Sequence, residues 1–487
     1  MAEAVAALYA VETAVEGAAV GAVALAQSTA PLHLSFRKIQ SPTQGRGLAR
    51  SGHTVNVVRG KVYLIGGDGQ NGEDGTIATL TLPVASSTGG EGTLEPQDFQ
   101  IVSPEFKSLE RPLARQTLSG ADGSRGGDFN RIGHSSTAID DKLFVVGGGS
   151  SSGGSAHSLD KFVVFDTLTS SYSILEADIS SCVDGIPPPR TNHSATASPF
   201  PTPSSLPDGP TVDAHGTVFI HGGRCTDVDT SHFKTLRDTW AFDIGTRVWA
   251  KLPDIPDPCP LEIAGEGRIV NVNNRLWRLG DGFGRVMYID LNGSHSSGAG
   301  SQISIALKTG VKWEVVNFGT EATDGASQGK MSSEPATTSS QPVSLPLPRV
   351  SSGVVPITTG SGREHLIYFM GRDSVIGPLD DFWSFQIDAD KNTAASVKDK
   401  IRDAVAANST SSWKSGRHTW AKCEQKKEEK QESRDAVAMW PPGLYDFGSD
   451  VWSDQGRDVF LIWGGKNRGH EGSQEEVVDG GWVVTVK

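Results

Sequence analysis

The chain has 487 residues, whereas one ordinary domain holds about 100–200, so it has either several domains or a repeat fold. Its 44 basic and 57 acidic residues give a formal net charge of −13, which argues against a nucleic-acid partner, because such a partner binds a basic face. No window approaches the run of about 18 apolar residues that a membrane-spanning helix needs, so we expect no membrane partner.

An Ala-rich segment over residues 1–31 opens the chain, and we expect it to form a helix. Glu3, Glu12 and Glu16 interrupt its apolar run, and no basic residue precedes it. A secretory signal needs a positively charged start, so export by that route is not expected. The four cysteines show no CxxC spacing, which is typical of reduced thiols in a cytoplasmic protein. They are Cys182, Cys225, Cys259 and Cys423.

A phrase that recurs along the chain follows this segment. Residues 50–69 read RSGHTVNVVRGKVYLIGGDG, and residues 131–150 read RIGHSSTAIDDKLFVVGGGS. In both, a histidine lies three residues after the arginine, and a glycine pair begins sixteen residues after it. Such internal repeats are the main sequence signature of repeat folds, so they dominate the prediction of the fold.

Four further units follow the first two, in less regular form. The third ends in GTVFIHGG; the fourth has Gly267 in place of the histidine; in the fifth, Arg372 replaces one glycine of the pair. Each unit holds short strands rich in Val, Ile, Phe, Tyr and Trp, bounded by Gly, Asp or Asn. A four-stranded sheet cannot bury both of its faces alone, but a ring of such sheets can.

We therefore predict an all-β, six-bladed propeller over residues 32–487, with blades that start near residues 50, 131, 190, 265, 349 and 434. The long insertions at 291–305, 318–346 and 389–416 have no role assigned by the sequence. The sixth unit ends in GGWVVTVK without a fourth strand, whereas residues 32–40 form a strand without a blade. We expect residues 32–40 to pair with residues 481–487 and so to close the ring, because this pairing removes two exposed sheet edges.

The aligned RxxH…GG…W…W units resemble kelch repeats over residues 33–487. The whole chain resembles the stand-alone fungal kelch proteins of the galactose oxidase/kelch propeller superfamily. The resemblance implies a binding scaffold whose channel mouth recognises a partner. It also leaves open a second function, that of an accessory protein or a cofactor-free cyclase or isomerase-type enzyme in a fungal secondary-metabolite pathway. A deep cavity lined by Trp240, Trp277 or Trp383 would favour that second function, but packing is the favoured role for these side chains.

Five arginines at the starts of the innermost strands are the candidate ligand-binding residues. They are Arg50, Arg131, Arg190, Arg349 and Arg434. Equivalent positions in a ring converge near its channel, and several guanidinium groups there would bind an acidic peptide or protein, or a small organic molecule. In kelch substrate adaptors that this chain resembles, arginines at this position capture acidic peptides. The alternative is that they hold the blades together through hydrogen bonds to carbonyl groups.

Three aligned histidines, His53, His134 and His193, suggest a metal site at first sight. One histidine per blade at an equivalent depth is better explained by packing between blades. The clustered tyrosines and cross-linked cysteine that a galactose oxidase copper site requires are not recognisable, and GxSxG, Walker and strand-associated GxGxxG motifs are missing. We therefore expect no metal and no cofactor. We also expect the protein to be a monomer.

Overall fold

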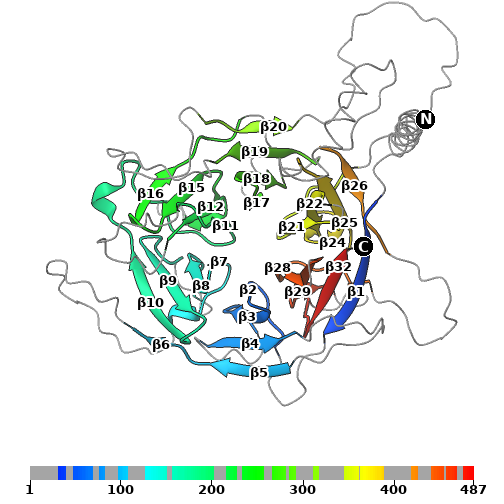
Figure 1. Cartoon of the computed structure of the whole chain (residues 1–487), viewed down its shortest axis with the longest axis horizontal. Coiled ribbons are helices and arrows are strands. Elements are labelled where there is room, and N and C mark those ends of the chain that lie inside the picture. Colours follow the sequence, from blue (N-terminus) through cyan, green and yellow to red (C-terminus); the bar gives the residue numbers. More distant parts are fainter. Residues whose placement is uncertain are drawn as a thin grey trace, which may run out of the picture.

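The computed structural model describes the chain in segments, and the account below refers to these residues only. They are 31–39, 48–69, 76–82, 97–107, 127–150, 156–201, 215–226, 233–256, 266–280, 284–291, 311–316, 345–360, 362–388, 418–425, 440–454, 457–468 and 475–486. Their strands form six sheets of four or five strands, arranged in a ring, as Figure 1 shows. The predicted all-β, six-bladed propeller is therefore confirmed.

The helix expected over residues 1–31 lies outside the described residues except for Pro31, so the division into a helix and a propeller stays a prediction. In the described part of the chain, no helix has the length and apolar character needed to cross a membrane.

The first three blades follow the chain from the innermost to the outermost strand. Blade one has β2 (Thr54–Val58), β3 (Lys61–Ile65), β4 (Ile77–Thr81) and β5 (Gln97–Val102). Blade two has β7 (Ser135–Ile139), β8 (Lys142–Val146), β9 (Lys161–Asp166) and β10 (Ser171–Glu176), with β6 (Glu105–Phe106) parallel to β10. Blade three has β11 (Ser194–Ser198), β12 (Thr217–His221), β15 (Thr239–Asp243) and β16 (Val248–Lys251). Two short 3₁₀ helices, η1 (Gly127–Phe129) and η2 (Ile179–Ser181), lie in the connections.

The other three blades repeat this order. Blade four has β17 (Arg268–Val272), β18 (Arg275–Leu279), β19 (Val286–Asp290) and β20 (Glu314–Val316). Blade five has β21 (Gly353–Thr358), β22 (Glu364–Phe369), β25 (Phe382–Gln386) and β26 (Trp420–Lys422). Blade six has β28 (Gly448–Asp454), β29 (Arg457–Trp463), β32 (Gly481–Val486) and β1 (His33–Ile39), with β27 (Glu424–Gln425) beside β1.

The hydrophobic cores lie between neighbouring blades, because the middle strands are buried on both faces. All residues of β12 and β15 are buried, for example. Between blades two and three, the rings of Phe162 and Phe242 stack with centroids 4.5 Å apart. Each blade thus completes the core of the next, and this explains why the apolar runs of the sequence do not alternate with polar residues.

The N-terminal strand closes the ring, as predicted. β1 pairs with β32 in antiparallel register from Leu34 opposite Val486 to Ile39 opposite Gly481, and Figure 1 shows the two strands side by side. Leu34 and Ile39 are both fully buried. Leu34 packs into the core shared with blade five, and Ile39 packs into the core shared with blade one. The two ends of the chain therefore hold the same blade together.

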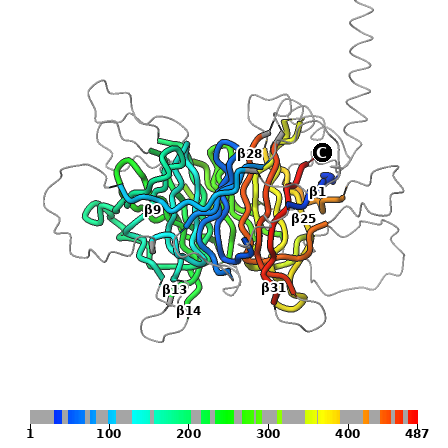
Figure 2. Tube along the Cα trace, turned by 90° about the horizontal axis from the view of Figure 1, so that it is seen from below, coloured from blue at the N-terminus to red at the C-terminus, as the bar shows by residue number. Residues whose placement is uncertain are grey.

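Three short hairpins extend from one face of the propeller, between the second and third strands of their blades. They are β13 (Arg224–Thr226) with β14 (Phe233–Thr235), β23 (Arg372–Asp373) with β24 (Gly377–Pro378), and β30 (Lys466–Asn467) with β31 (Glu476–Val477). Figure 2 shows β13, β14 and β31 along the same edge. We call this side the hairpin face. The innermost strands also begin at this end, because they are antiparallel to the second strands.

Candidate binding site in the channel

The arginines that begin the innermost strands each bind a carbonyl group of their own blade. The Nη1 group donates to the residue that follows the second strand: Arg50 to Gly66, Arg131 to Gly147, Arg190 to Gly222 and Arg349 to Met370, at 3.0, 3.0, 3.0 and 3.1 Å. Arg131, Arg190 and Arg349 are at most 5% exposed. Their guanidinium groups thus lie within the frame of the propeller.

The backbone at these arginines binds the preceding blade. The Arg131 carbonyl accepts a hydrogen bond from Gly67 N at 2.8 Å, and the Arg190 carbonyl accepts one from Gly148 N at 3.0 Å. The same bond runs from Gly465 N to the Arg50 carbonyl at 2.9 Å and joins blade six to blade one. The guanidinium groups thus stabilise their own blades, and it is the backbone of these residues that joins neighbouring blades. None of these arginines lines the cavity described below.

Blade six has a leucine at the equivalent position. The Leu444 carbonyl accepts from Gly371 N at 2.8 Å, and Tyr445 then forms the bridge to Lys466 that Ser51 forms to Asp68 in blade one. Arg434, the candidate suggested by the sequence for this blade, lies outside the described residues.

Carboxylates neutralise two of the buried arginines. Asp238 binds Arg190 through both carboxylate oxygens, at 2.7 and 2.9 Å, and Asp381 binds Arg349 in the same way. Burial is the largest single effect and opposes ionisation of both carboxyl groups. The hydrogen bonds and the positive charge of the guanidinium group, together with a hydrogen bond from Trp240 or Trp383, outweigh it and lower the pKa of each. Arg131 has only carbonyl acceptors, at Gly147 and Asp128, and burial lowers its pKa to about 10.

The three histidines pack between blades, as expected. His134 lies against Gly66 and His193 against Gly147, where a Cβ atom on the glycine would lie 2.7 and 2.6 Å from the Cε1 atom. The first glycine of each pair therefore leaves room for the histidine of the next blade. Burial is the main cause that lowers the pKa of His134 to about 3 and the pKa of His53 and His193 well below 6.5. All three rings are thus neutral at neutral pH.

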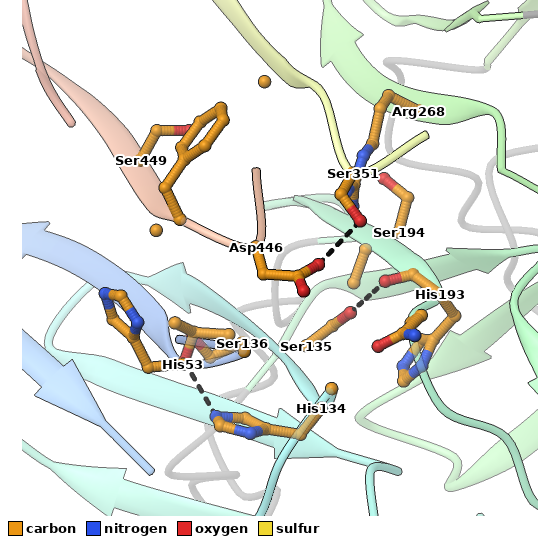
Figure 3. Close-up of a pocket in the computed structure, with 18 of the residues that line it drawn as sticks. His53, His134, Ser135, Ser136, His193, Ser194, Arg268, Ser351, Asp446 and Ser449 are labelled. Atoms are coloured by element: carbon orange, nitrogen blue, oxygen red, sulfur yellow. Dashed lines mark hydrogen bonds between the residues drawn. The ribbon is translucent and has the colours of Figure 1, made fainter. Parts of the chain in front are cut away.

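A polar cavity of about 170 Å³ lies where the six innermost strands begin. Its lining forms layers, because each blade contributes residues from equivalent positions. The rim holds Gly52, Gly133, Asn192, Ser351 and Asp446; the next layer holds His53, His134, His193, Ser352 and Phe447. Below them lie Thr54, Ser135, Ser194, Arg268, Gly353 and Gly448, and then Val55, Ser136, Ala195, Ile269, Val354 and Ser449. Figure 3 shows the three histidines, Arg268, Asp446 and several of the lining serines around the cavity.

Hydrogen bonds between blades fix several of the lining hydroxyl groups. Ser135 Oγ donates to the His193 carbonyl at 2.6 Å, and Ser194 Oγ accepts from Ile269 N at 3.0 Å. Thr54 Oγ1 and His134 Nε2 form a hydrogen bond of 2.9 Å. The serine bonds pair backbone groups at the inner edges of these strands, which would otherwise lack a partner. They hold the cavity wall in place.

The rim is a chain of backbone hydrogen bonds. Asn192 N donates to the Gly133 carbonyl, Gly133 N to the Gly52 carbonyl, and Gly52 N to the Asp446 carbonyl, at 2.7, 2.9 and 2.8 Å. All four residues, and Ser351, have φ between 52° and 64°, the left-handed region. At Gly133 a side chain would also collide with Asn192, which explains the glycine there.

Arg268 brings a charge into this cavity. It occupies, in blade four, the position that Thr54 and Ser194 occupy in their blades, as the strand registers show. The side chain is partly buried, and Figure 3 shows its guanidinium group directed toward Ser351 and Ser194. Its Nε atom is buried without a hydrogen-bond partner, and no ion pair of Arg268 is found in the described segments.

The sequence interpretation did not single out Arg268, because it followed the residues that recur. The available signal was a basic residue at a strand position where other units carry a small hydroxyl side chain. Asp446 is the second charged residue of the lining, and its Oδ1 atom accepts from Ser351 Oγ at 2.7 Å. The chemistry of the cavity is thus one cation, one carboxylate and seven hydroxyl groups from serine and threonine.

The tryptophans considered for an aromatic cavity lie elsewhere. Trp240, Trp277 and Trp383 are at most 5% exposed and belong to the cores between blades. Phe447 contributes the one phenyl ring of the lining. Within the described segments, no group of three or more His, Cys, Asp and Glu side chains is placed to hold a metal ion.

The comparison with protein families agrees with this architecture. Residues 130–176, which cover blade two, match the family described as Kelch motif. Together with the six-bladed arrangement, this match supports a kelch-repeat propeller. No curated protein matches the chain. A solved structure entitled "Structure of YjhT" aligns over 92% of this chain and 99% of its own, with 13% sequence identity and a TM-score of 0.42.

Proposed function

We propose that the propeller is a protein-binding scaffold whose partner docks on the hairpin face and places an acidic side chain in the channel cavity, beside Arg268. Kelch propellers commonly serve as protein-binding scaffolds. The observation that carries the proposal is the guanidinium group of Arg268, which faces the cavity with a buried Nε donor that has no partner. A buried donor without an acceptor is costly, and a carboxylate from a partner satisfies it.

The size and lining of the cavity agree with side-chain groups, not a folded segment, as the occupant. A volume of about 170 Å³ leaves no space for a folded segment, but it accepts a carboxylate group. The hydroxyl group of Ser194 lies beside Arg268. Because its oxygen accepts from Ile269 N, its hydrogen can be donated to a carboxylate oxygen. The proposed interaction is thus one charge-assisted contact supported by a neutral hydroxyl donor.

The hairpin face, on which the cavity lies, also carries exposed apolar side chains. Val375 and Ile376, at the tip of the β23–β24 hairpin, are 90% and 57% exposed, and Phe233 on β14 is 76% exposed. The tip is ordered by Asp373, whose Oδ1 atom accepts from Val375 N and Ile376 N at 2.8 and 2.9 Å. Large exposed apolar side chains on the face where a polar cavity lies favour a docking face for a protein.

The acidic character of the whole chain does not exclude an acidic partner segment. At physiological salt, charges farther apart than about 8 Å are largely screened, so the net charge of −13 acts weakly on the approaching segment. Arg268 acts at contact distance and in a partly desolvated site, where an ion pair is much stronger. The buried arginines of the repeat support the site indirectly, because each stabilises the blade to which it belongs.

Peptide binding tests this proposal directly. A library of short peptides in which Asp or Glu is paired with Asn or Gln at the same position is screened on the intact protein. We expect acidic peptides to bind better than their amide counterparts, and we expect Arg268→Gln to abolish that preference.

The matched control is Arg59→Gln. Arg59 lies in the turn between β2 and β3, at the opposite end of blade one, and its side chain is 69% exposed in an ion pair with Asp141. This variant should keep the preference for acidic peptides. Equal binding of acidic and amide peptides by the unmodified protein, or an acidic preference that persists in Arg268→Gln, would refute the proposal.

A further inference from the structure

Arg268 and Asp446 face the same cavity but do not bind each other. Both line it, and Figure 3 shows the Asp446 carboxylate between Ser351 and the serines of the opposite wall. In the described segments, the recorded contact of the Asp446 side chain is the hydrogen bond from Ser351 Oγ at 2.7 Å to Oδ1. Two unlike charges that share a small cavity without closing on each other leave room for a ligand group between them.

The backbone holds Asp446 in this position. Its φ of +55° places it in the left-handed region, and its carbonyl accepts from Gly52 N at 2.8 Å. Ser351, which orients the carboxylate, also has a left-handed φ, of 52°. Such conformations persist at non-glycine residues only where the surrounding structure enforces them. The carboxylate is therefore presented to the cavity by a fixed rim.

The two charges also define the field of the cavity. The three histidines of the lining are neutral at neutral pH, because burial lowers the pKa of each. An occupant that carries two carboxylates meets one favourable and one unfavourable charge. An occupant that carries a carboxylate beside an ammonium, guanidinium or amide donor meets two favourable groups.

We propose that the cavity recognises a pair of unlike groups, a carboxylate received by Arg268 and a cationic or N–H donor group received by Asp446, and that Asp446 is the residue that determines this specificity. The inference rests on the proposed function, from which it takes Arg268 as the carboxylate site. It narrows the partner to a segment in which an acidic residue is accompanied by a basic or amide residue. A run of consecutive acidic residues is disfavoured.

Small probe molecules test the inference without knowledge of the partner. The probes are glycine, β-alanine and 4-aminobutyrate, each compared with the carboxylate that lacks the amino group: acetate, propionate and butyrate. Binding to the intact protein is measured by ligand-observed NMR titration. In parallel, peptides with an Asp-Lys pair are compared with peptides that have Asp-Asp at the same place.

The variants separate the two charges. Asp446→Asn retains an oxygen for the Ser351 hydrogen bond but removes the charge, Arg268→Gln removes the cation, and Asp254→Asn is the matched control. The Asp254 side chain is 79% exposed, is paired with Lys251 and does not line the cavity. Melting curves confirm that each variant folds.

We expect at least one amino carboxylate, and the Asp-Lys peptides, to bind the unmodified protein about tenfold more tightly than their counterparts. In Asp446→Asn this advantage should disappear while carboxylate binding is retained, and Asp254→Asn should behave as the unmodified protein. The inference is wrong if the amino group adds no affinity, if its advantage survives in Asp446→Asn, or if neither probes nor peptides bind. Carboxylate binding that survives in Arg268→Gln would instead contradict the proposed function itself.

Discussion

Arg278 Nε donates a hydrogen bond of 2.7 Å to His221 Nε2 across the boundary between blades three and four. Because the arginine can only donate, His221 carries its proton on Nδ1, which donates to Thr239 Oγ1 at 2.8 Å. Both side chains are fully buried. Arg278 occupies the space that Gly267 leaves, since a Cβ atom at Gly267 would lie 2.5 Å from Arg278 Nη2. The histidine missing from the fourth unit is therefore replaced by an arginine from the neighbouring strand.

This replacement predicts a non-additive pair of substitutions. Gly267→His alone should destabilise the protein, because the new side chain collides with Arg278. Arg278→Leu alone should lower the free energy of unfolding by about 1–3 kcal/mol, because it leaves the buried His221 Nε2 without a donor. The double variant should recover part of the loss, because the histidine then has the space. Urea unfolding of the four proteins measures the coupling, and additive losses would contradict this account.

The fold could be predicted from the sequence because each repeat encodes the same local structure. The spacing from Arg50 to the glycine pair, and the unpaired strand at residues 32–40, were enough to predict both the blades and the closure by β1. The glycine replaced in unit five was assigned wrongly. Gly371 occupies the second glycine's place, and Met370, with φ of 52°, occupies the first; Arg372 follows the pair. Periodicity alone did not resolve this shift of one residue.

The binding cavity could not be predicted in the same way. Residues that recur in several units have the same structural role in each of those blades, as Arg131 and His134 do. The charges of the cavity come instead from positions where one blade departs from the others, at Arg268 and Asp446. Repeated residues therefore predict the structure of the propeller, but they do not identify the side chains that differ between blades and give the cavity its charge.

The repeated arginine is expected to contribute to stability rather than to affinity. Arg131→Met should lower the free energy of unfolding by about 1–3 kcal/mol, because the Gly147 and Asp128 carbonyls lose their donor. Its affinity for acidic peptides should remain that of the unmodified protein, whereas Arg268→Gln should show the reverse pattern. Thermal melting and peptide titration on the same samples check both. A stable Arg131→Met variant with weakened binding would show that the repeated arginines form the ligand site.

Closure by the N-terminal strand predicts a strong effect of one buried residue. Leu34→Asp places a charge in the core shared by blades five and six, where Leu34 is fully buried, so the melting temperature should fall sharply. His33→Asp, at the neighbouring exposed position of β1, is the matched control and should change it little. Deletion of residues 1–40 should also promote aggregation, because it exposes the edge of β32. Unchanged melting after deletion would show that the pairing contributes nothing to stability.

A buried carboxylate between blades six and one predicts a pH dependence. Asp450 Oδ2 accepts from Val57 N at 2.7 Å and Oδ1 accepts from Val451 N at 2.8 Å. Burial raises the pKa of Asp450 from 3.8 to about 6, and the two hydrogen bonds offset this only in part. At the equivalent place between blades three and four, Thr196 Oγ1 accepts from Asn271 N at 3.1 Å without any charge.

Because the folded pKa of Asp450 lies above its unfolded value, the fold favours the protonated form. The destabilisation by the carboxylate is absent below about pH 4, grows up to about pH 6 and is constant above that. Asp450→Thr removes it and retains an acceptor for Val57 N. The melting temperature of this variant, relative to the unmodified protein, should therefore rise between pH 4 and pH 6. The buried histidines oppose this trend, but they are common to both proteins and cancel in the difference. A difference that is flat across this range, or that falls, would show that Asp450 is ionised in the fold without cost.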